Sequence, residues 1–454
     1  MTYLLNIFIK LKLITKRNYH NEDHNEVVKA TVVIFCTKIF FALIGFFTNV
    51  VIARTLNIAD SGYYFFMISV ITLLSTISLV GLDNAIVNFI SKANSKNDFY
   101  QVKRLFSTSI RIALFMSFVT SILVYFFIYY CFPLFFDDEG YKTPLTWAVF
   151  IIPLVCVFMV ILKSFQGLKL IKLFAVFNGI TRLLIFIGVV LLVFFYGHLN
   201  VESMYWLYFI ASLLVLIIAY ASWLYFTHNI ADNYDESNLS RLTNFTQLNS
   251  SYYRYCFSVW GISCLAIIMG QGVQILLAML ANSEQVAYFA VANRIALLVA
   301  FFLVSINGIL SPKFAEISAQ GDQQRLQQIY RSSTRLMFFV TSPILLVSFI
   351  FADNILLLFG EQYQNASLVL RVLIIAQLVK VLVGSVGQLL IMSGLVRNQN
   401  INLLIAVIIL IMSSFILLPY YGALGGAIAT LLAVIVNNTL GLYTVQKKLK
   451  ISLF

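Results

Sequence analysis

The segment "IARTLNIADSGYYFF" at residues 52–66 has a second, diverged version, "LAMLANSEQVAYFA" at residues 277–290. Aligning Tyr64 with Tyr288 sets an offset of 224, which is close to half of the 454 residues. A repeat at an offset of half the chain length is typical of a duplicated fold, in which the two halves have the same architecture.

The repeat continues beyond this segment. At the same offset Asp60 aligns with Glu284 and Arg111 with Arg335, and with a small shift the Tyr-Gly pair at 196–197 aligns with the pair at 421–422. Apolar composition raises the number of chance matches, so each pair alone is weak evidence. The inference depends on the order of the matches, which is kept through six apolar segments.

The composition is that of an integral membrane protein. The chain is 61% hydrophobic and 11% charged, with a mean hydropathy of +0.92, and a water-soluble domain needs more surface charge. Apolar runs recur at lengths that cross a hydrocarbon core of about 30 Å as helices. These twelve predicted spans are 30–53, 63–82, 110–132, 145–162, 173–196, 203–226, 256–281, 286–310, 336–353, 367–392, 401–418 and 423–445.

Duplication of six spans predicts the architecture. An even number of spans returns the chain to the same side, so both halves point the same way. We therefore expect an all-α polytopic membrane protein made of two six-helix bundles, related by a pseudo-two-fold axis along the membrane normal with a central cleft. The predicted parts are a cytoplasmic N-terminal segment that is either an interfacial helix or a frayed tail (1–29), an N-lobe (30–226), a cytoplasmic linker (227–255), a C-lobe (256–445) and a basic tail (446–454).

The basic residues predict the orientation. If the N-terminus is cytoplasmic, 23 of the 30 Lys and Arg residues fall on the cytoplasmic side, and only Arg54, Lys142 and Arg371 fall outside. This is the positive-inside pattern, and it places both termini in the cytoplasm. The net charge of +12 therefore reflects topology and anionic lipids, and we expect no nucleic-acid partner.

Few residues suit metal or enzyme chemistry. The five cysteines lie in apolar surroundings without paired spacing, and the four histidines fall outside the spans, so we expect no metal, no disulfide and no cofactor. A membrane polymerase or glycosyltransferase needs a sizeable extramembrane domain or loop carboxylates. The predicted outer loops are short, and "DDEG" at 137–140 is typical of an acidic turn, so a transporter is the favoured class.

Four basic residues fall in the interior of the predicted spans, namely Lys38, Arg182, Arg294 and Lys380, whereas Arg111 and Arg371 stand near span ends. Each charge at the bilayer centre costs about 2.5–3.5 kcal/mol on insertion scales. None of the 18 acidic residues lies in a span interior, and the deepest two, Asp83 and Asp353, stand at span ends. The four cations are therefore predicted to line a hydrated cavity and to bind a mobile anion. The alternative is that they extend to an interface or bond backbone carbonyls, which is easier for Lys38 and Arg294 than for the deeper pair.

Two further features suggest moving parts. Span seven contains "MGQGVQ", in which Gly270, Gln271, Gly272 and Gln274 weaken the helix and offer polar groups, so we predict helix gating there. Close helix packing through small residues is the alternative. Arg54, at the outer end of the first span, is a candidate for an outer gate.

Four motifs resemble those of a known family. They are "ARTLNIADSGYYFF" after the first span, "LSPKFAEISAQGD" after the eighth, "LLFGEQYQNASLVLRVL" between the ninth and tenth, and "PYYGALGGAIAT" at the start of the twelfth. Together they are similar to the polysaccharide transporter branch of the multidrug/oligosaccharidyl-lipid/polysaccharide superfamily, the O-antigen flippases. Asn57 stands where the family usually has glycine, and asparagine tolerates the left-handed conformation that such a turn favours.

This resemblance implies a function and a location. It implies a flippase of the bacterial cytoplasmic membrane that carries a polyprenyl-diphosphate-linked oligosaccharide from the inner to the outer leaflet by alternating access. The product would serve surface polysaccharide assembly, such as O-antigen or capsule, alongside polysaccharide polymerase or assembly proteins. The in-span arginines would then hold the diphosphate bidentately, and the lysines would act as point charges.

Two members of the same superfamily are alternatives. A multidrug or cation exporter shares the architecture, but it needs carboxylates inside the membrane, and none lies in the interior of these spans. The peptidoglycan-precursor flippases have fourteen spans, against the twelve predicted for this chain.

Overall fold

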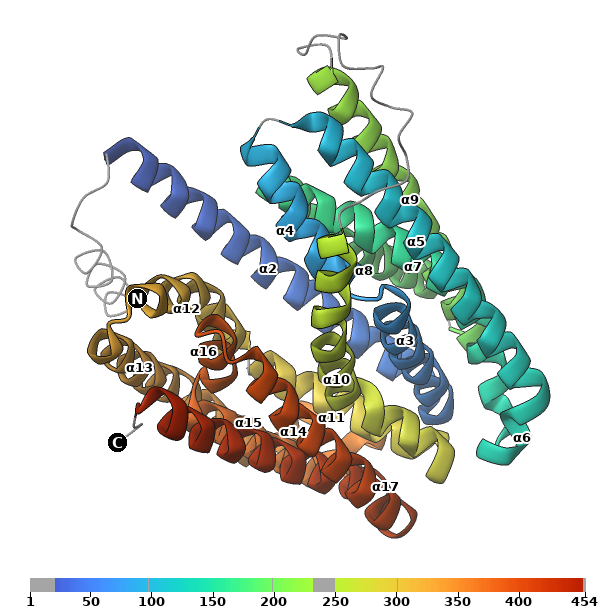
Figure 1. Ribbon diagram of the computed structural model, residues 1–454. Coiled ribbons are helices and arrows are strands. Elements are labelled where there is room, and N and C mark those ends of the chain that lie inside the picture. The colour runs from blue at the N-terminus through green and yellow to red at the C-terminus, as the bar shows by residue number, and fades with distance from the viewer. Residues whose placement is uncertain (1–20, 97, 198, 232–249, 300, 452–454) are drawn as a thin grey trace.

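The computed structural model describes residues 21–96, 98–197, 199–231, 250–299 and 301–451, and within these ranges all regular secondary structure is helical. Two groups of helices lie side by side in Figure 1, one blue to green and the other yellow to red. We call them the N-lobe and the C-lobe. That each lobe moves as a unit remains a prediction.

The N-lobe packs α2 on α8, and α7 on α4, α5 and α9. Its elements are α2 (Asn21–Thr55), α3 (Ile58–Ser78), α4 (Leu82–Ser95), α5 (Phe99–Phe126), the π-helix η1 (Phe127–Cys131), α6 (Phe132–Phe135), the 3-10 turn η2 (Glu139–Tyr141), α7 (Lys142–Gly167), α8 (Ile171–Tyr196) and α9 (Val201–Ala231).

The C-lobe packs α17 against α10, α15 and α16, and α13 against α12 and α15. Its elements are α10 (Ser250–Leu280), α11 (Ser283–Val299), α12 (Phe301–Gln320), α13 (Gln323–Ile350), α14 (Ala352–Leu357), the 3-10 turn η4 (Glu361–Ala366), α15 (Ser367–Val383), α16 (Val386–Met392) and α17 (Val396–Leu449).

Each predicted span coincides with a helix or a helix pair. Among the described residues, nine helices are long and apolar enough to cross a bilayer. The last two predicted spans are two helices that share the label α17 and meet at a kink at Gly422, where φ is 52° and ψ is −128°. The eighth predicted span covers parts of α11 and α12, with residue 300 outside the described part of the chain, and the tenth is divided between α15 and α16. The chain is thus an all-helical polytopic membrane protein, whereas the number twelve and the pseudo-two-fold axis remain predictions.

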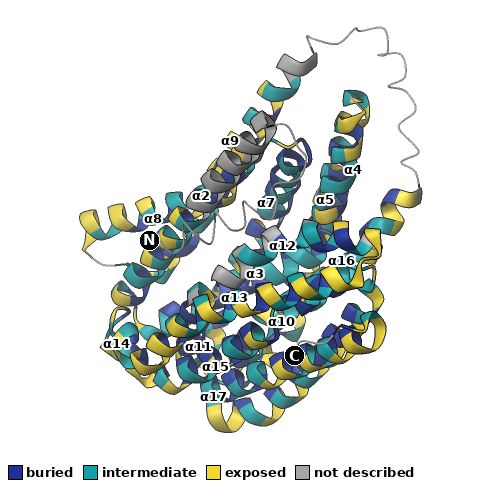
Figure 2. Cartoon of the chain, turned by 90° about the vertical axis from the view of Figure 1, so that its left-hand side faces the viewer, coloured by how far each residue is buried: buried dark blue, intermediate teal, exposed yellow. Residues whose placement is uncertain are grey.

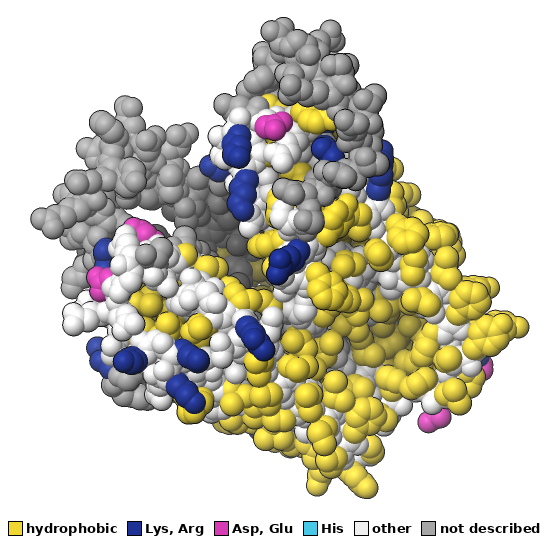
Figure 3. All heavy atoms as spheres, viewed as in Figure 1, with side chains coloured by type: hydrophobic (Ala, Val, Ile, Leu, Met, Phe, Trp, Pro, Cys, Tyr) yellow, Lys and Arg dark blue, Asp and Glu magenta, His cyan; other side chains and the backbone are white. Residues whose placement is uncertain are grey.

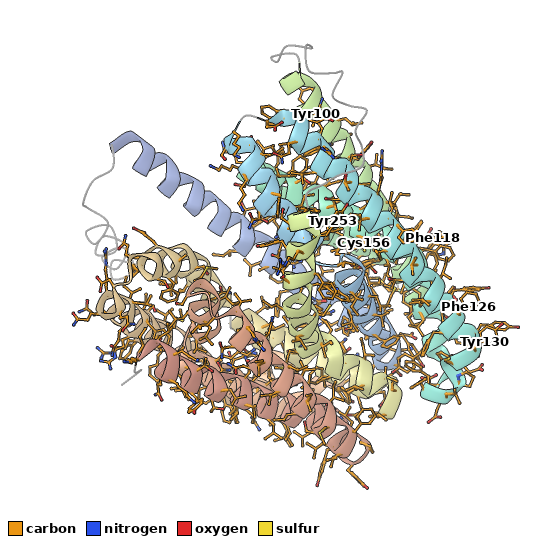
Figure 4. The ribbon with its side chains drawn as sticks, in the orientation of Figure 1. Tyr100, Phe118, Phe126, Tyr130, Cys156 and Tyr253 are labelled. Atoms are coloured by element: carbon orange, nitrogen blue, oxygen red, sulfur yellow. The ribbon has the colours of Figure 1, made fainter. Side chains whose placement is uncertain are left out.

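The surface has the distribution expected of a protein in lipid. Buried, intermediate and exposed residues alternate along the helices, and stretches of exposed residues lie at the periphery (Figure 2). Phe118 and Phe126 of α5 and Tyr130 of η1 are each more than half exposed and point away from the helices around them (Figure 4). Apolar side chains cover the lower right of Figure 3, and Lys and Arg gather at its top and left. We call the end of the molecule that contains Asn57 and Asn282 the predicted outer end.

The lobes meet along α3, which runs antiparallel to α10. Near the predicted outer end, a Cβ atom at Gly62 would lie 1.9 Å from the carbonyl oxygen of Ser283. Midway, Ser69 Oγ donates a hydrogen bond of 2.9 Å to Gln271 Oε1. At the opposite end, Trp260 Nε1 donates to the carbonyl of Ile77 at 3.1 Å. We call this interface the α3 seam, and its closeness requires glycine at position 62.

Some local expectations need correction or lie outside the described residues. The predicted segment 1–29 is undescribed up to residue 20, and its remainder belongs to α2, which begins at Asn21. The turn at Asn57 does not need the left-handed conformation, because Asn57 is extended, with φ of −60° and ψ of 156°. That interpretation of Asn57 was wrong, because the residue precedes α3 as an ordinary N-cap.

The proline inside α7 is accommodated by a neighbouring helix. Pro153 has no N–H, so the carbonyl four residues earlier, on Val149, loses its helical partner. Ser121 of α5 donates its hydroxyl to that carbonyl at 2.8 Å. The helix therefore continues through Pro153 as one element.

Candidate functional site: a cavity with two arginines

A cavity of about 730 Å³ opens on the inner faces of α2, α3, α7, α8 and α9. The C-lobe closes part of it with residues of α11 and with Phe359. Most of the wall is apolar, but hydroxyl and amide groups are interspersed. These polar lining residues are Thr48, Asn49, Tyr64, Thr72, Asn178, Thr181, Tyr208 and Ser212.

Arg182 lines the cavity from α8, and its side chain is exposed. Two glycines without a Cβ atom allow α2 and α8 to pack closely and still leave space for this side chain. A Cβ at Gly45 would lie 3.3 Å from Arg182 Cδ, and one at Gly179 would lie 2.0 Å from the ring of Phe41. The guanidinium of Arg182 therefore extends into the cavity from a tightly packed helix pair.

Arg294 enters the same cavity from the C-lobe, on α11. Its Nη1 donates a hydrogen bond of 2.5 Å to Asn49 Oδ1 of α2. Its Cζ lies 3.8 Å from the ring centroid of Phe65 on α3, within the range of a cation–π interaction. Both contacts come from the N-lobe, so Arg294 links the two lobes at the cavity wall.

The cavity carries positive charge without a matching carboxylate. Its lining residues, all within the described part of the chain, include two arginines and no Asp or Glu. Two ion pairs among the described residues, Lys142 with Glu139 and Arg371 with Asp353, involve none of the lining residues. Guanidinium groups in a partly desolvated site favour phosphate and carboxylate ligands, which they bind through paired N–H donors.

The other two predicted cations are not brought into this group. Lys38 lies on α2, but its side chain falls outside the described residues. Lys380 lies on α15, one turn before the helix ends at Gly384, and it is not among the lining residues. The structure thus joins Arg182 with Arg294 and leaves the role of the two lysines as a prediction.

Arg54 contacts the opposite lobe at the predicted outer end. Its Nε donates to the carbonyl of Leu358 at 2.7 Å, and its Nη2 to that of Leu357 at 3.1 Å. Gln362 reciprocates by donating to the carbonyl of Ala53 at 3.0 Å. Together with Asn49–Arg294 and the perpendicular pair of Phe46 and Phe359, whose ring centroids are 5.4 Å apart, these contacts form what we call the α2 seam.

The glycine and glutamine cluster of span seven lies in an unbroken helix, because α10 continues from Ser250 to Leu280. Gly270 has no atom within 4 Å of a Cβ position, so close packing does not explain this glycine. Gln271 accepts the bond from Ser69. Gln274 is buried, and its Nε2 has no partner among the described residues. Gating by these residues remains a prediction.

Three residues of this region were not identified from the sequence. Asn49 and Gln362 are neutral amides, and a search for charges within spans passes over them. Phe65 is one of 41 phenylalanines, and nothing in the sequence separates it from the others. An amide inside an otherwise apolar span was the available signal for Asn49.

Comparisons with known proteins agree on a family and a fold. The profile of a family described as polysaccharide biosynthesis protein matches residues 27–318. The probable low-salt glycan biosynthesis flippase Agl15 of Haloferax volcanii is 24% identical over 209 residues, which are 45% of this chain and 41% of that protein. The alignment thus spans about two fifths of the length of this relative.

Solved structures show the same fold at low identity. An inward-facing multidrug resistance MATE family transporter of the MOP superfamily superposes with a TM-score of 0.70 and 13% identity, over 90% of this chain and 94% of that one. The lipid II flippase MurJ, in an inward closed conformation, gives 0.68 and 16%, over 91% and 87%. The profile match covers more than half of the chain and confirms the predicted resemblance to a polysaccharide biosynthesis family, and the superpositions confirm the all-helical fold. Transport as the activity stays a prediction.

Proposed function

Because the chain belongs to the polysaccharide biosynthesis protein family, we propose that it is a flippase for a polyprenyl-diphosphate-linked oligosaccharide. It carries this lipid from the inner to the outer leaflet of the bacterial cytoplasmic membrane, with both termini in the cytoplasm. The translocated glycan serves assembly of a surface polysaccharide such as O-antigen or capsule.

One observation supports this proposal most strongly, namely the pair of arginines in a cavity without lining carboxylates. A cation exporter needs an acidic group to hold its substrate or coupling ion. Arg182 and Arg294 have no carboxylate partner among the lining residues, and a diphosphate ester supplies the negative counter-charge. The arginines come from different lobes, so one diphosphate held by both would bind the lobes together.

The size and composition of the cavity suit the head of such a lipid. A volume of about 730 Å³ lies within the usual range for sites that enclose a small ligand. The hydroxyl and amide groups of the wall offer hydrogen bonds to sugars, and the aromatic rings of Tyr64 and Tyr208 offer faces for stacking. The polyprenyl chain stays in the bilayer, because burying it in the cavity would gain nothing over lipid.

The membrane potential favours this direction of transport. An inside-negative potential drives anions outward by about 2.3 kcal/mol per charge per 100 mV. We therefore propose that export of the diphosphate needs no dedicated coupling ion. Unchanged translocation after the potential is collapsed would count against this part of the proposal.

The test measures translocation in proteoliposomes with a fluorescent polyprenyl-diphosphate disaccharide. We expect Arg182→Gln and Arg294→Gln each to slow translocation by about tenfold or more, since hydrogen bonds to charged groups are among the stronger ones. Lys38→Gln and Lys380→Gln test the two remaining predicted cations in the same assay.

Arg397→Gln is the matched control. Arg397 is exposed near the start of α17 and does not line the cavity, so this variant also loses one positive charge but should keep the parental rate. Normal translocation in both cavity variants would overturn the proposed site.

A further inference from the structure

The contact between Arg294 and Asn49 raises a question of chemistry. Arg294 belongs to α11 of the C-lobe, whereas Asn49 belongs to α2 of the N-lobe. An arginine inside a membrane protein is usually expected to pair with a carboxylate. At this position the acceptor is instead the side-chain amide oxygen of asparagine, which carries no charge.

The amide of Asn49 has a defined orientation. Its Nδ2 donates a hydrogen bond of 2.6 Å to the carbonyl of Gly45, one turn earlier on α2. This bond turns the Oδ1 atom toward Arg294, where it accepts from Nη1. Asn49 can therefore serve Arg294 only as an acceptor, and its position is fixed by its own helix.

The charge of Arg294 remains available. A guanidinium has five N–H donors, and Asn49 accepts from one of its nitrogens. The Phe65 ring covers one face of the guanidinium without neutralising it. A carboxylate in place of the Asn49 amide would neutralise the charge and compete directly with an anionic ligand.

Resting on the proposed function, we propose that Asn49 is the positioning residue that keeps this site selective for anions. As a neutral acceptor it holds Arg294 in the cavity across the lobe interface, and it leaves the positive charge for the diphosphate. The neutrality of its amide oxygen, rather than the size of its side chain, is what the site requires.

Two variants separate the two parts of this role. Asn49→Asp keeps the shape and the contact but supplies a negative charge to Arg294. Asn49→Ala removes the contact but leaves the charge of Arg294 uncompensated. A residue that mattered only for packing would tolerate Asp better than Ala, whereas the proposal predicts the opposite order for ligand binding.

The experiment measures binding of farnesyl diphosphate to the purified full chain in detergent, at low and high salt. We expect Asn49→Asp to weaken binding by about tenfold or more, comparable to Arg294→Gln, and to reduce its salt dependence. We expect Asn49→Ala to weaken it by only about threefold, through loss of positioning. In the double variant Asn49→Asp/Arg294→Gln, the two losses should not add, because both act on one charge.

Thermal unfolding shows whether each variant is folded, and Asn49→Asp should be at least as stable as the parent because it gains an ion pair. If Arg294→Gln weakens binding but Asn49→Asp does not, the role of Asn49 is wrong and the cavity stands. If neither Arg182→Gln nor Arg294→Gln changes binding, the proposed function loses its site. Equal losses in the Asp and Ala variants would also overturn the role, since charge would then be irrelevant.

Discussion

The two seams between the lobes differ in extent. The contacts of the α3 seam run from Gly62 at the predicted outer end to Trp260 at the other. The contacts of the α2 seam described above all come from residues 46–54 of α2. In the predicted repeat, α2 corresponds to α10 and α3 to α11, so the two seams should be equivalent. We propose from this difference that one seam is a lasting joint and the other is the part that opens.

The chemistry of the seams agrees with this division. The α3 seam depends on backbone approaching backbone at a glycine, which requires close contact and does not tolerate separation. The α2 seam depends on long polar side chains that reach carbonyl oxygens across the lobes. Such bonds can be exchanged for bonds to water, so they break and re-form at modest cost. We therefore expect the lobes to rock about α3 and to separate along α2.

The largest effect should come from breaking the α3 seam. In Gly62→Ala, the added Cβ would lie 1.9 Å from the carbonyl of Ser283, so the helices must separate. We expect a loss of about 3 kcal/mol in unfolding free energy, at the upper end for overpacking, measured by thermal unfolding in detergent. Gly261→Ala on α10 is the control, because nothing lies within 4 Å of that position. Equal stability of the two variants would contradict the close contact.

Breaking the α2 seam should change conformation more than stability. In the double variant Arg54→Ala/Gln362→Ala, three hydrogen bonds to the carbonyls of Leu357, Leu358 and Ala53 are lost. We expect the population separated at the predicted outer end to rise about tenfold, since roughly 1.4 kcal/mol of lost contact is sufficient. Electron paramagnetic resonance distances between spin labels at Asn57 and Glu361 measure this opening.

Labels at Lys96 and Arg254, near the other end of the α3 seam, provide the control for that variant. Their distance distribution should stay narrow, because the seam beside them is intact. Broadening at both pairs would show that the lobes have no lasting joint along α3.

The smallest effect should come from the polar pair in the middle of the α3 seam. Ser69→Ala removes the hydrogen bond to Gln271, and such bonds between membrane helices contribute about 0.6 kcal/mol on average. We expect a loss of that size in thermal unfolding and no change in the opening measured at Asn57 and Glu361. A large gain in opening would show that this pair, rather than glycine packing, holds the joint.

Helix positions were predictable because they depend on local apolar length. All twelve predicted runs fall on helices or helix pairs. Breaks within them were not predicted, because a turn such as Gly384, with φ of 74°, leaves the hydropathy unchanged. The shared kink of α17 at Gly422 had a signal in the neighbouring Pro419, since proline removes a helical hydrogen bond.

The candidate site was predictable only in part. Arg182 and Arg294 were identifiable because a charge in a span is costly and needs a hydrated place. Lys380 carries the same cost, yet it does not line the cavity. The sequence could not separate it from the two arginines, because residue spacing gives the depth of a side chain but not the neighbour that it faces. Asn49 has no charge, and its role depends on a helix 245 residues away in the chain.

The hydrogen bond from Ser121 to the carbonyl of Val149, four residues before Pro153, bears on the rigidity of α7. A proline leaves one helical carbonyl without a donor, which makes the helix flexible at that point. A hydrogen bond from an adjacent helix to that carbonyl restores the lost contact and stiffens the helix. Because α5 supplies this hydrogen bond, we expect α7, which forms part of the cavity wall, to be rigid along its length. A displacement of one end of α7 is then transmitted to its other end without bending at Pro153.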